Sequence, residues 1–442
     1  MAVRTFLQLF APRLPARRLN AVHRRYARRR RPAQLSFAQL LLALVYHALM
    51  GQGRLQDAVA DLWRLCLSAS ALSQRRQTLP WEIFRDLLAE CLQPLARARQ
   101  HPQAFYKGWR LLGLDGTCFG VHNVPRLVRA LGKAASRRFK AAFAQVRTVV
   151  IVELGMHNPI AARIGRNGES ELELAWELIK QLPARCLLLA DRLYGTPLFI
   201  AELLGQCLAV KAQFLVRIRK NLKTRVLEVL ADGSVLVELI VRDEHGKKFR
   251  FLVREIRGRV VGRGSKRTSL RLWTSLLDAK QYPALELLAL YGQRWEVEIT
   301  VKELKVELRG SDRLASYTPE TAAQEIAALL LAQSVLAQAR CAASGQGEVE
   351  VLRISFRETV RLVRVLWTWL VMGEGVFTRR QTRAAIRRMI KRLSGQVTPE
   401  RRARTCPRGL RQPVSSWPRV IRRRELHGQF RYEVIPHHAS KP

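Results

Sequence analysis

The stretch YGQRWEVEITVKELK, from Tyr291 to Lys305, carries a ring hydroxyl, a guanidinium, a carboxylate and an ammonium at offsets of 0, +3, +7 and +14. These groups belong to Tyr291, Arg294, Glu298 and Lys305. At about 100° per residue, an α-helix brings all four within an arc of about 60°. A carboxylate between two cations suits a site that holds a metal ion beside a phosphate. A solvated face of salt-bridged neighbours has the same spacing, so both interpretations stay open here.

The sequence upstream of this stretch alternates between apolar runs and an amphipathic pattern. RLLGLD ends at Asp115, and the β-branched run RTVVIVEL (147–154) is followed, after a turn-like Gly-Met-His-Asn, by NPIAARIG. These runs predict buried strands, and the last two predict a hairpin. ESELELAWELIKQL (169–182) then predicts an amphipathic helix, with Glu169 and Glu171 placed against its N-terminal dipole.

A second carboxylate follows the next apolar run. RCLLLAD ends at Asp191, and TPLFIAELLGQC (196–207) predicts a helix behind it. We therefore predict a mixed α/β core in which Asp115 and Asp191 each stand where a strand ends, a usual place for functional groups in open α/β sheets.

The periodicity changes to two over residues 214–275, which predicts a mostly antiparallel β subdomain. Asp232 and Gly233 indicate one hairpin turn, and residues 244–246 indicate another. This subdomain is inserted before the helix of the opening stretch, which we expect to run from Pro283 through Leu308.

Both ends of the chain are predicted to be helical and basic. Apolar residues recur at helical spacing over residues 35–99 and 311–372, where Thr318 is a candidate cap. Residues 1–36 contain ten Arg and no acid, and residues 378–424 contain sixteen Lys or Arg with Glu400 as the one acid. We expect each basic end to be a DNA-contacting arm, with a solvated leader or a disordered tail as the alternative. The N-terminal helices could form a helix-turn-helix-like reader, although no turn signature supports it.

The charge of the chain indicates a polyanionic partner. Its 442 residues include 77 Lys and Arg against 35 Asp and Glu, for a net charge of +42. A GC-rich genome would increase Arg but would not remove acids, so the surplus favours nucleic acid.

Membrane, secretory and thiol-based classes are not indicated. Leu35–Met50 is short of about 20 apolar residues and carries Gln39 and His47, so no membrane partner is expected. The apolar part of the first residues is too short for a signal peptide. The seven Cys are scattered without C-x-x-C spacing, which indicates neither a zinc site nor a disulfide framework and fits a reducing cytosol.

Three carboxylates stand out, on Asp115, Asp191 and Glu298, with gaps of 76 and 107 residues between them. The β-rich insertion accounts for the longer gap. Three convergent oxygen ligands suit hard cations such as Mg²⁺ or Mn²⁺. Two such ions about 4 Å apart can activate a nucleophile and stabilise the leaving oxygen of a phosphodiester. Each acid alone is a weak signal, because an Asp that ends a strand is commonly only a turn former.

Three stretches closely resemble the DDE transposases of the insertion-sequence-4 family: GLDGT (113–117), LLADRLYG (188–195) and the opening stretch. The family hallmark is Tyr, two residues, Arg, three residues, Glu, six residues, Lys. This chain matches it at Tyr291, Arg294, Glu298 and Lys305. The resemblance spans roughly residues 35–370. It implies an RNase H-like catalytic core with a β insertion, flanked by helical N- and C-terminal regions.

The resemblance also implies roles by position. Two Mg²⁺ ions, for which Mn²⁺ can substitute, would be bound by the catalytic residues Asp115, Asp191 and Glu298. Phosphates or the element end would be contacted by Tyr291, Arg294 and Lys305.

Four apolar or aromatic positions bear on the fine geometry of the site. Leu193 stands where the family commonly has Gly, and Val301 where an aromatic is common. We expect Trp295 to pack the helix on the core. Family members can capture a flipped base with a Trp of the insertion, but we expect Trp273, inside RLWTSL, to pack in the core.

The predicted organisation has six parts. They are a helical, basic DNA-binding region (1–105), the first part of the RNase H-like core (106–213), the inserted β subdomain (214–278), the last core helix with Glu298 (279–310), a helical C-terminal region (311–375) and a basic tail (376–442).

The predicted function is DNA transposition of a bacterial insertion sequence. The enzyme would bind terminal inverted repeats, cut DNA at the element ends and join the 3′-OH to target DNA, as a homodimer in the cytoplasm at the nucleoid, with no small-molecule substrate. The alternatives are a non-catalytic DNA-binding derivative, another RNase H-like nuclease and, less favoured, a tyrosine recombinase.

Overall fold

The computed structural model describes residues 16–26, 34–51, 53–133, 143–166, 168–242, 246, 248–261, 268–311, 313–373, 375–399 and 431–435. The chain divides into two compact units, each of which is described by itself. Unit 1 comprises Met1–Gln181 and Glu296–Thr398, and unit 2 comprises Leu182–Trp295 and Pro399–Pro442. Both units mix strands and helices, which confirms the predicted α/β class.

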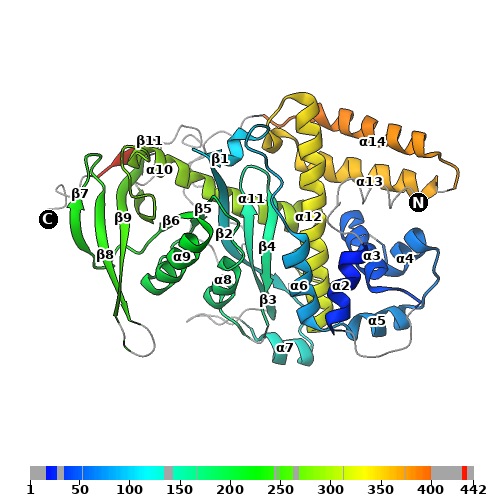
Figure 1. Ribbon diagram of the computed structural model, residues 1–442. Helices are drawn as coiled ribbons and strands as arrows, with labels where there is room; N and C mark the ends of the chain where they lie inside the picture. Colours follow the sequence, from blue (N-terminus) through cyan, green and yellow to red (C-terminus); the bar gives the residue numbers. More distant parts are fainter. Residues whose placement is uncertain are drawn as a thin grey trace, which may run out of the picture. The chain divides into compact units, whose positions relative to one another are not determined.

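The strands of unit 1 form an antiparallel meander (Figure 1). Its order is β4–β3–β2, formed by Asn158–Ile164, Gln145–Glu153 and Trp109–Gly120, and the short β1 (Phe105–Tyr106) pairs with β2. The predicted hairpin of β3 and β4 is confirmed. Nearly all residues of β3 and β4 are buried, which is why these strands are continuous apolar runs rather than alternating ones.

Helices cover both faces of this meander. On one face α8 (Glu171–Ile179) begins at Ser170, whose hydroxyl accepts from the Glu173 amide in a capping box, and the Glu171 carboxylate lies over Gly116 of β2. The other face packs against α11 (Trp295–Lys302) and the long α12 (Pro319–Gly347), which caps at Thr318 as predicted.

The helix α12 is the centre of unit 1. It contacts β4, α3, α6, α13 and α14, and most of its residues are buried. By length and composition α12 could cross a membrane, but 83% of its apolar window is buried inside the protein, as expected of a core helix. The sequence did not single out this segment as a candidate span.

Among the described residues five helices precede the meander, and the apolar spacing predicted the four that lie within residues 35–99. They are α2 (Ala16–Tyr26), α3 (Phe37–Met50), α4 (Leu55–Trp63), α5 (Ala69–Gln77) and α6 (Trp81–Cys91), and the short α7 (Pro125–Leu131) follows β2. The expectation of an arm or leader is wrong for α2, because Leu19 and Val22 are buried and the helix packs on α3 and α6. Of the densest basic segment, HRRYARRRRPAQ (23–34), residues 27–33 lie outside the described residues.

Unit 2 begins with two parallel strands. β5 (Cys186–Ala190) and β6 (Gln213–Arg217) pair in parallel, and α9 (Pro197–Val210) connects them. The meander of unit 1 followed by α8, β5, α9 and β6 is the element order of an RNase H-like core. β6 pairs in parallel with β5 and antiparallel with β10, so the predicted insertion boundary at residue 214 falls within β6.

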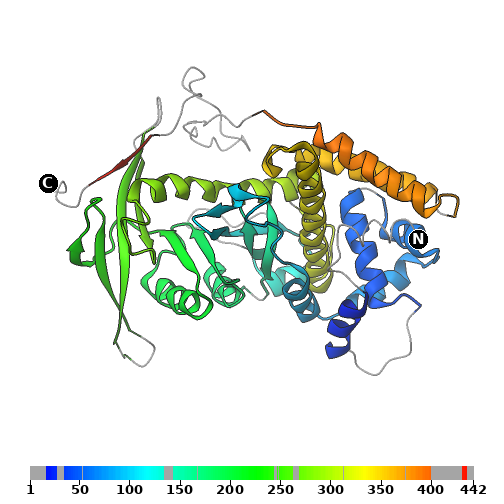
Figure 2. The ribbon, with the colours of Figure 1, turned by 45° about the horizontal axis from the view of Figure 1, so that its top comes forward.

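The insertion itself is antiparallel, as predicted (Figure 2). β6 is followed across the sheet by β10 (Thr268–Thr274), β9 (Lys248–Val261), β8 (Val235–Arg242) and β7 (Arg225–Val229). The turn at Asp232 and Gly233 is confirmed, with Gly233 at φ +80°, where glycine carries no Cβ penalty. Of the second predicted turn only Gly246 lies within the described residues.

The basic C-terminal segment differs from the predicted tail. Residues Arg379–Ser394 form α14, whose buried residues pack on α12 and α13 (Phe356–Met372), so the helical region extends past residue 375. Farther along, β11 (Arg431–Val434) adds to the edge of β9. The remaining part of the predicted arm, residues 400–430, lies outside the described residues.

The predicted helix from Pro283 through Leu308 is helical throughout but not regular. It consists of α10 (Ala284–Tyr291), a 3₁₀ turn (Gly292–Arg294), α11 and a π-helical turn (Glu303–Leu308). The idealised arc of about 60° therefore does not apply, because 3₁₀ and π turns change the angular step per residue.

Candidate active site

Asp115 lies in the middle of β2, not at its end as predicted. It is paired in register with Val150 of β3, and the strand continues to Gly120. The side chain is partly exposed, and one carboxylate oxygen accepts the Gly116 amide at 2.9 Å. Residues 113, 115, 117 and 119 share one face of the strand because side chains alternate. Thr117 and Phe119 meet α11 and α12 on this face, so Asp115 belongs to the face that α11 covers.

Gly113 brings α11 directly against β2. A Cβ built on Gly113 would overlap Val297 Cγ2 and would lie 2.7 Å from Leu154 Cδ2. Val297 is fully buried, and the next residue is Glu298, in the first turn of α11 and partly exposed. Unit 1 therefore brings the strand that carries Asp115 and the helical turn that carries Glu298 into contact.

The third carboxylate belongs to unit 2. Asp191 directly follows β5, as predicted, and is partly exposed. Its Oδ1 accepts the backbone N–H of Leu193 at 2.7 Å, which closes a tight turn beyond the strand. The donor is the backbone N–H of residue 193. Leu193 therefore makes this hydrogen bond as well as the Gly that is common at this position in the family.

Tyr291 is anchored to the strand end that carries Asp191. Its ring is buried, and its hydroxyl donates to the Ala190 carbonyl at 3.3 Å. Burial raises the pKa of Tyr291 to about 12, although Arg294 and Arg217 act in the opposite direction. The hydroxyl therefore stays protonated as a donor. Contact of Tyr291 with DNA stays a prediction.

The expectation that Trp295 packs in the core is wrong. Its side chain is 51% exposed, and the Arg294 guanidinium lies 5.5 Å from the centre of its ring. Arg294 also hydrogen-bonds Tyr291. The exposed ring thus supports the guanidinium through a cation–π contact. Trp273, in contrast, is fully buried and donates to Glu255 at 2.9 Å, which confirms the expected core packing.

Lys305 is held by β2 of its own unit. Its ammonium donates to the Cys118 carbonyl at 2.6 Å and lies 4.9 Å from the centre of the Phe119 ring. Lys305 lies in the π-helical turn. The four residues of the hallmark divide between the units. Tyr291 and Arg294 belong to unit 2, and Glu298 and Lys305 belong to unit 1.

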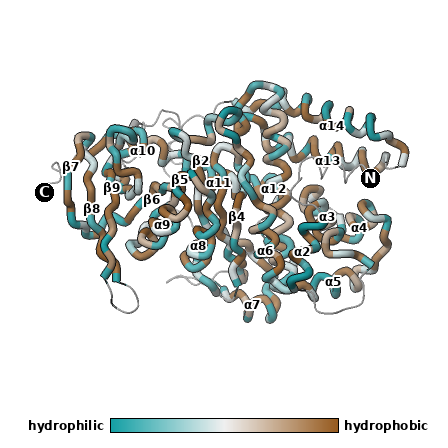
Figure 3. The backbone as a smooth tube through the Cα atoms, in the orientation of Figure 1, coloured by the Kyte–Doolittle hydropathy of each residue, from teal (hydrophilic) through white to brown (hydrophobic). Residues whose placement is uncertain are grey.

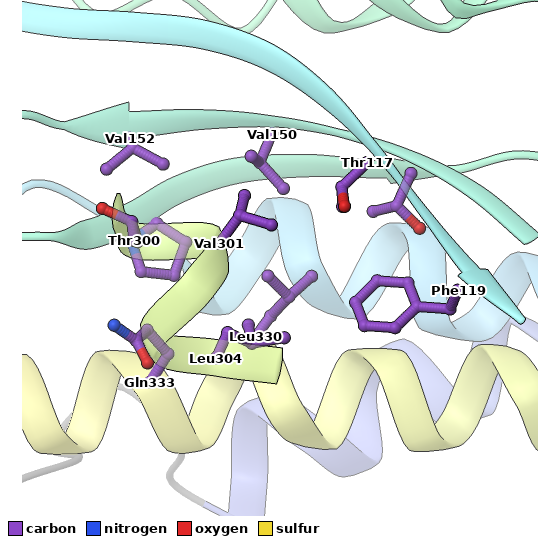
Figure 4. Close-up of a pocket in the computed structure, with 11 residues that line it drawn as sticks. Thr117, Phe119, Val150, Val152, Thr300, Val301, Leu304, Leu330 and Gln333 are labelled. Carbon is purple, nitrogen blue, oxygen red and sulfur yellow. The ribbon is translucent and has the colours of Figure 1, made fainter. Parts of the chain in front are cut away.

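A small pocket lies between the sheet and α12 of unit 1 (Figure 4). Thr117 and Phe119 line it from β2, and Val301 and Leu304 line it from the helical segment, with Leu330 of α12 opposite. Its lining is mainly apolar, which indicates incomplete packing rather than a polar binding site. Val301, where the family commonly has an aromatic, is one of the side chains that leave this space.

The donor set fits a hard divalent cation. Asp115 and Glu298 in unit 1 and Asp191 in unit 2 offer only carboxylate oxygens, which Mg²⁺ and Mn²⁺ prefer. Among the described residues, no group of three or more His, Cys, Asp or Glu could hold a metal ion. The two-ion site therefore stays a prediction.

Sequence reasoning missed a buried polar group behind Glu298. His157, in the turn between β3 and β4, is fully buried with Glu296 and Glu303 at its two ring nitrogens. The sequence Gly-Met-His-Asn indicated only a turn. The signal that could have found the group is the pair of acids seven residues apart that brackets Glu298.

Comparison with known proteins identifies related sequences. The family model described as "Transposase DDE domain" matches residues 110–334. "Transposase InsG for insertion sequence element IS4" of Escherichia coli (strain K12) is 30% identical over 273 residues, or 61% of this chain, and the match spans 60% of that relative's length. A solved "piggyBac transposase synaptic complex with hairpin DNA" is 12% identical with a TM-score of 0.42, over 87% of this chain and 84% of the other.

Proposed function

The chain belongs to the transposase DDE domain family, and on that premise we propose that it is the transposase of a bacterial insertion sequence of the insertion-sequence-4 group. It binds the terminal inverted repeats, cuts DNA at the element ends and joins the ends to target DNA. The observation that carries the proposal is the contact of α11 with β2 at Gly113, which brings the segments of Asp115 and Glu298 together.

The three carboxylates have one role in this proposal. Asp115, Asp191 and Glu298 would hold two Mg²⁺ ions. Such ions would activate the attacking oxygen and stabilise the leaving one. Because no protein side chain forms a covalent bond to DNA, the chain contributes positioning and charge neutralisation.

The reaction consists of two transfers at phosphorus. Water first forms a bond to a phosphorus at the element end, and the bond to the 3′ oxygen breaks, which leaves a 5′-phosphate and a free 3′-OH. That 3′-OH then loses its proton and attacks a second phosphodiester, either on the opposite strand or in target DNA, where another 3′ oxygen leaves.

The cations beside the carboxylates hold the DNA end. Arg294, supported by the exposed Trp295, is suited to a bidentate phosphate contact. Lys305 places one positive charge beside β2. Tyr291 acts on Asp191 through the Ala190 carbonyl, as a positioning residue.

The basic surface supplies affinity for DNA that depends on salt. Seven exposed cations lie on α14, which has no acid, so we assign DNA contact to this folded helix rather than to an arm alone. The enzyme works on two element ends at once, as a homodimer on DNA, in the bacterial cytoplasm at the nucleoid.

The test is cleavage of a labelled element end by the purified protein in Mg²⁺. We expect the wild type to produce a nick or a hairpin. Each of Asp115→Ala, Asp191→Ala and Glu298→Ala should lower the cleavage rate by at least about 10³-fold. DNA binding, measured on the same labelled end, should stay within about threefold. Chelation of the metal should have the same effect as these substitutions.

Three outcomes separate this proposal from its alternatives. Normal cleavage by Glu298→Ala would overturn the assignment of the site. A wild-type protein that binds the ends but neither cuts them nor binds Mn²⁺ would indicate a non-catalytic derivative. Cleavage of RNA or junctions in preference to element ends would indicate another nuclease.

A further inference from the structure

His157 bridges two acids of the helical segment that carries Glu298. Its Nε2 lies 2.7 Å from Glu296 Oε2, and its Nδ1 lies 2.8 Å from Glu303 Oε2. The imidazole is fully buried, and its backbone has φ +49°, in the left-handed region that non-glycine residues rarely occupy. A buried bulky residue in this region persists only where its surroundings hold it.

With Glu296 and Glu303 ionised, both ring nitrogens donate, because an ionised carboxylate only accepts, and the ring is then an imidazolium. Burial alone would lower the pKa of His157, but the charge of Glu303 and the hydrogen bonds to Glu296 and Glu303 outweigh burial, so the pKa is raised. Arg340 acts in the opposite direction but also pairs with Glu303 at 3.4 Å. Two carboxylates thus face two cations, which compensates the buried charge.

The bridge ties α11 at both of its ends. Glu296 lies in the first turn of α11, and Glu303 begins the π-helical turn that follows α11. Gln333 of α12 donates to Glu303 and to the His157 carbonyl, each at 3.3 Å, so the β3–β4 turn, the helical segment and α12 meet at this group. Glu298 lies between the two tied points, and about 200° separates it from Glu296 around the helix axis.

We propose that His157 is a positioning residue for Glu298: by clamping Glu296 and Glu303 it sets the rotation of α11 and hence the direction of the Glu298 carboxylate. The inference rests on the proposed function, since it concerns a ligand of the proposed metal site. His157 itself touches neither metal nor DNA.

The test is the affinity for Mn²⁺ of the full-length protein, measured from the free-ion signal in electron paramagnetic resonance, together with the metal concentration needed for half-maximal cleavage. His157→Gln removes a positive charge and with it a Coulomb repulsion of Mn²⁺. That change alone would strengthen Mn²⁺ binding. A lost clamp instead weakens Mn²⁺ binding by about tenfold, and the metal requirement rises in parallel.

A double-mutant cycle separates the clamp from general damage. Glu296→Gln alone should weaken Mn²⁺ binding, and His157→Gln combined with Glu296→Gln should be no worse than the worse single variant, because either change opens the same bridge. The matched control is Glu153→Gln. Glu153 is a buried acid in β3 that pairs with Arg110, so its substitution should lower the thermal midpoint without changing Mn²⁺ affinity.

The outcomes distinguish this inference from the proposed function. If the wild type cuts normally and His157→Gln binds Mn²⁺ as tightly as the wild type or more tightly, the positioning role of His157 is overturned and the proposed function stands. Equal losses in His157→Gln and Glu153→Gln also overturn this positioning role, in favour of a structural one. If the wild-type protein neither binds Mn²⁺ nor cuts DNA, the proposed function itself is overturned.

Discussion

Gly113 determines how closely α11 approaches β2. Any side chain at this position would meet Val297 and Leu154. We expect Gly113→Ala to displace α11, lower cleavage by at least about 10²-fold, and lower the free energy of unfolding by about 1–3 kcal/mol. Cleavage of the labelled end and denaturant unfolding measure the two effects.

The control for this prediction lies on the same strand. A Cβ on Gly120 would meet only Arg313, at an ordinary 3.9 Å, so Gly120→Ala should change cleavage little. Equal cleavage by Gly113→Ala and Gly120→Ala would contradict the argument from close approach.

Glu255 is expected to make unit 2 less stable at acid pH. Burial would raise the pKa of Glu255, but hydrogen bonds from Arg271, Trp273 and Arg257 and the charge of Arg271 outweigh burial and lower it. A lowered pKa in the folded state gives stability that is present above the unfolded pKa of about 4.3 and lost as the pH falls through the folded pKa.

We therefore expect Glu255→Gln to lower the thermal midpoint at pH 7, with the difference from wild type shrinking as the pH falls below about 4. Melting curves of both proteins between pH 3 and pH 7 measure this. A difference that is independent of pH would show that the Glu255 charge is not responsible.

At the level of single residues, the sequence identified candidate residues more reliably than it predicted whether their side chains are buried. Trp273 was correctly predicted to be buried, because it lies inside an alternating strand run. Trp295 was wrongly expected to pack on the core, because hydrophobicity alone does not indicate that a ring lies exposed beside a guanidinium, as this one does beside Arg294. Asp115 was placed at a strand end because the apolar run stops there, but β2 continues through partly exposed residues.

At the level of elements, α14 is predicted to hold DNA. Its buried residues face α12 and α13, and its seven cations are exposed. Figure 3 shows hydrophilic and hydrophobic residues alternating along this helix. We expect Arg383→Gln combined with Arg387→Gln to weaken binding of every DNA sequence alike and to reduce the slope of log K against log salt by about 1.8.

The control is an exposed Arg that already has a partner. Arg361 of α13 pairs with Glu358 at 2.6 Å, so Arg361→Gln should leave the salt slope unchanged. Salt titrations with equilibrium binding measure both variants, and thermal melts check that the fold is intact. An unchanged slope in the double variant would mean that α14 is only a solvated face.

Elements were predictable where their signal was local. The β3–β4 hairpin, α8, α13 and the cap at Thr318 follow from periodicity and capping chemistry. The 3₁₀ and π turns between Gly292 and Leu308 were not predictable, because they depend on bonds to distant partners. Lys305, for example, bonds a carbonyl 187 residues away along the chain.

On the scale of the whole molecule, the net charge of +42 and the order of carboxylates and insertion point to one kind of protein, which the family match supports. The three acids divide between two units that are discontinuous in sequence. The cleavage assay on element ends tests all three acids by their single substitutions.

The sequence by itself determined the class of the fold, the order of its elements and the identity of the candidate acids, since these follow from local periodicity and from the spacing of a few polar groups. Only the tertiary structure decided that α11 rests on Gly113, that α14 is a packed helix and that His157 joins acids 139 and 146 residues away. The physical reason is that burial and pairing depend on contacts between distant segments, and no local pattern encodes which segments will meet.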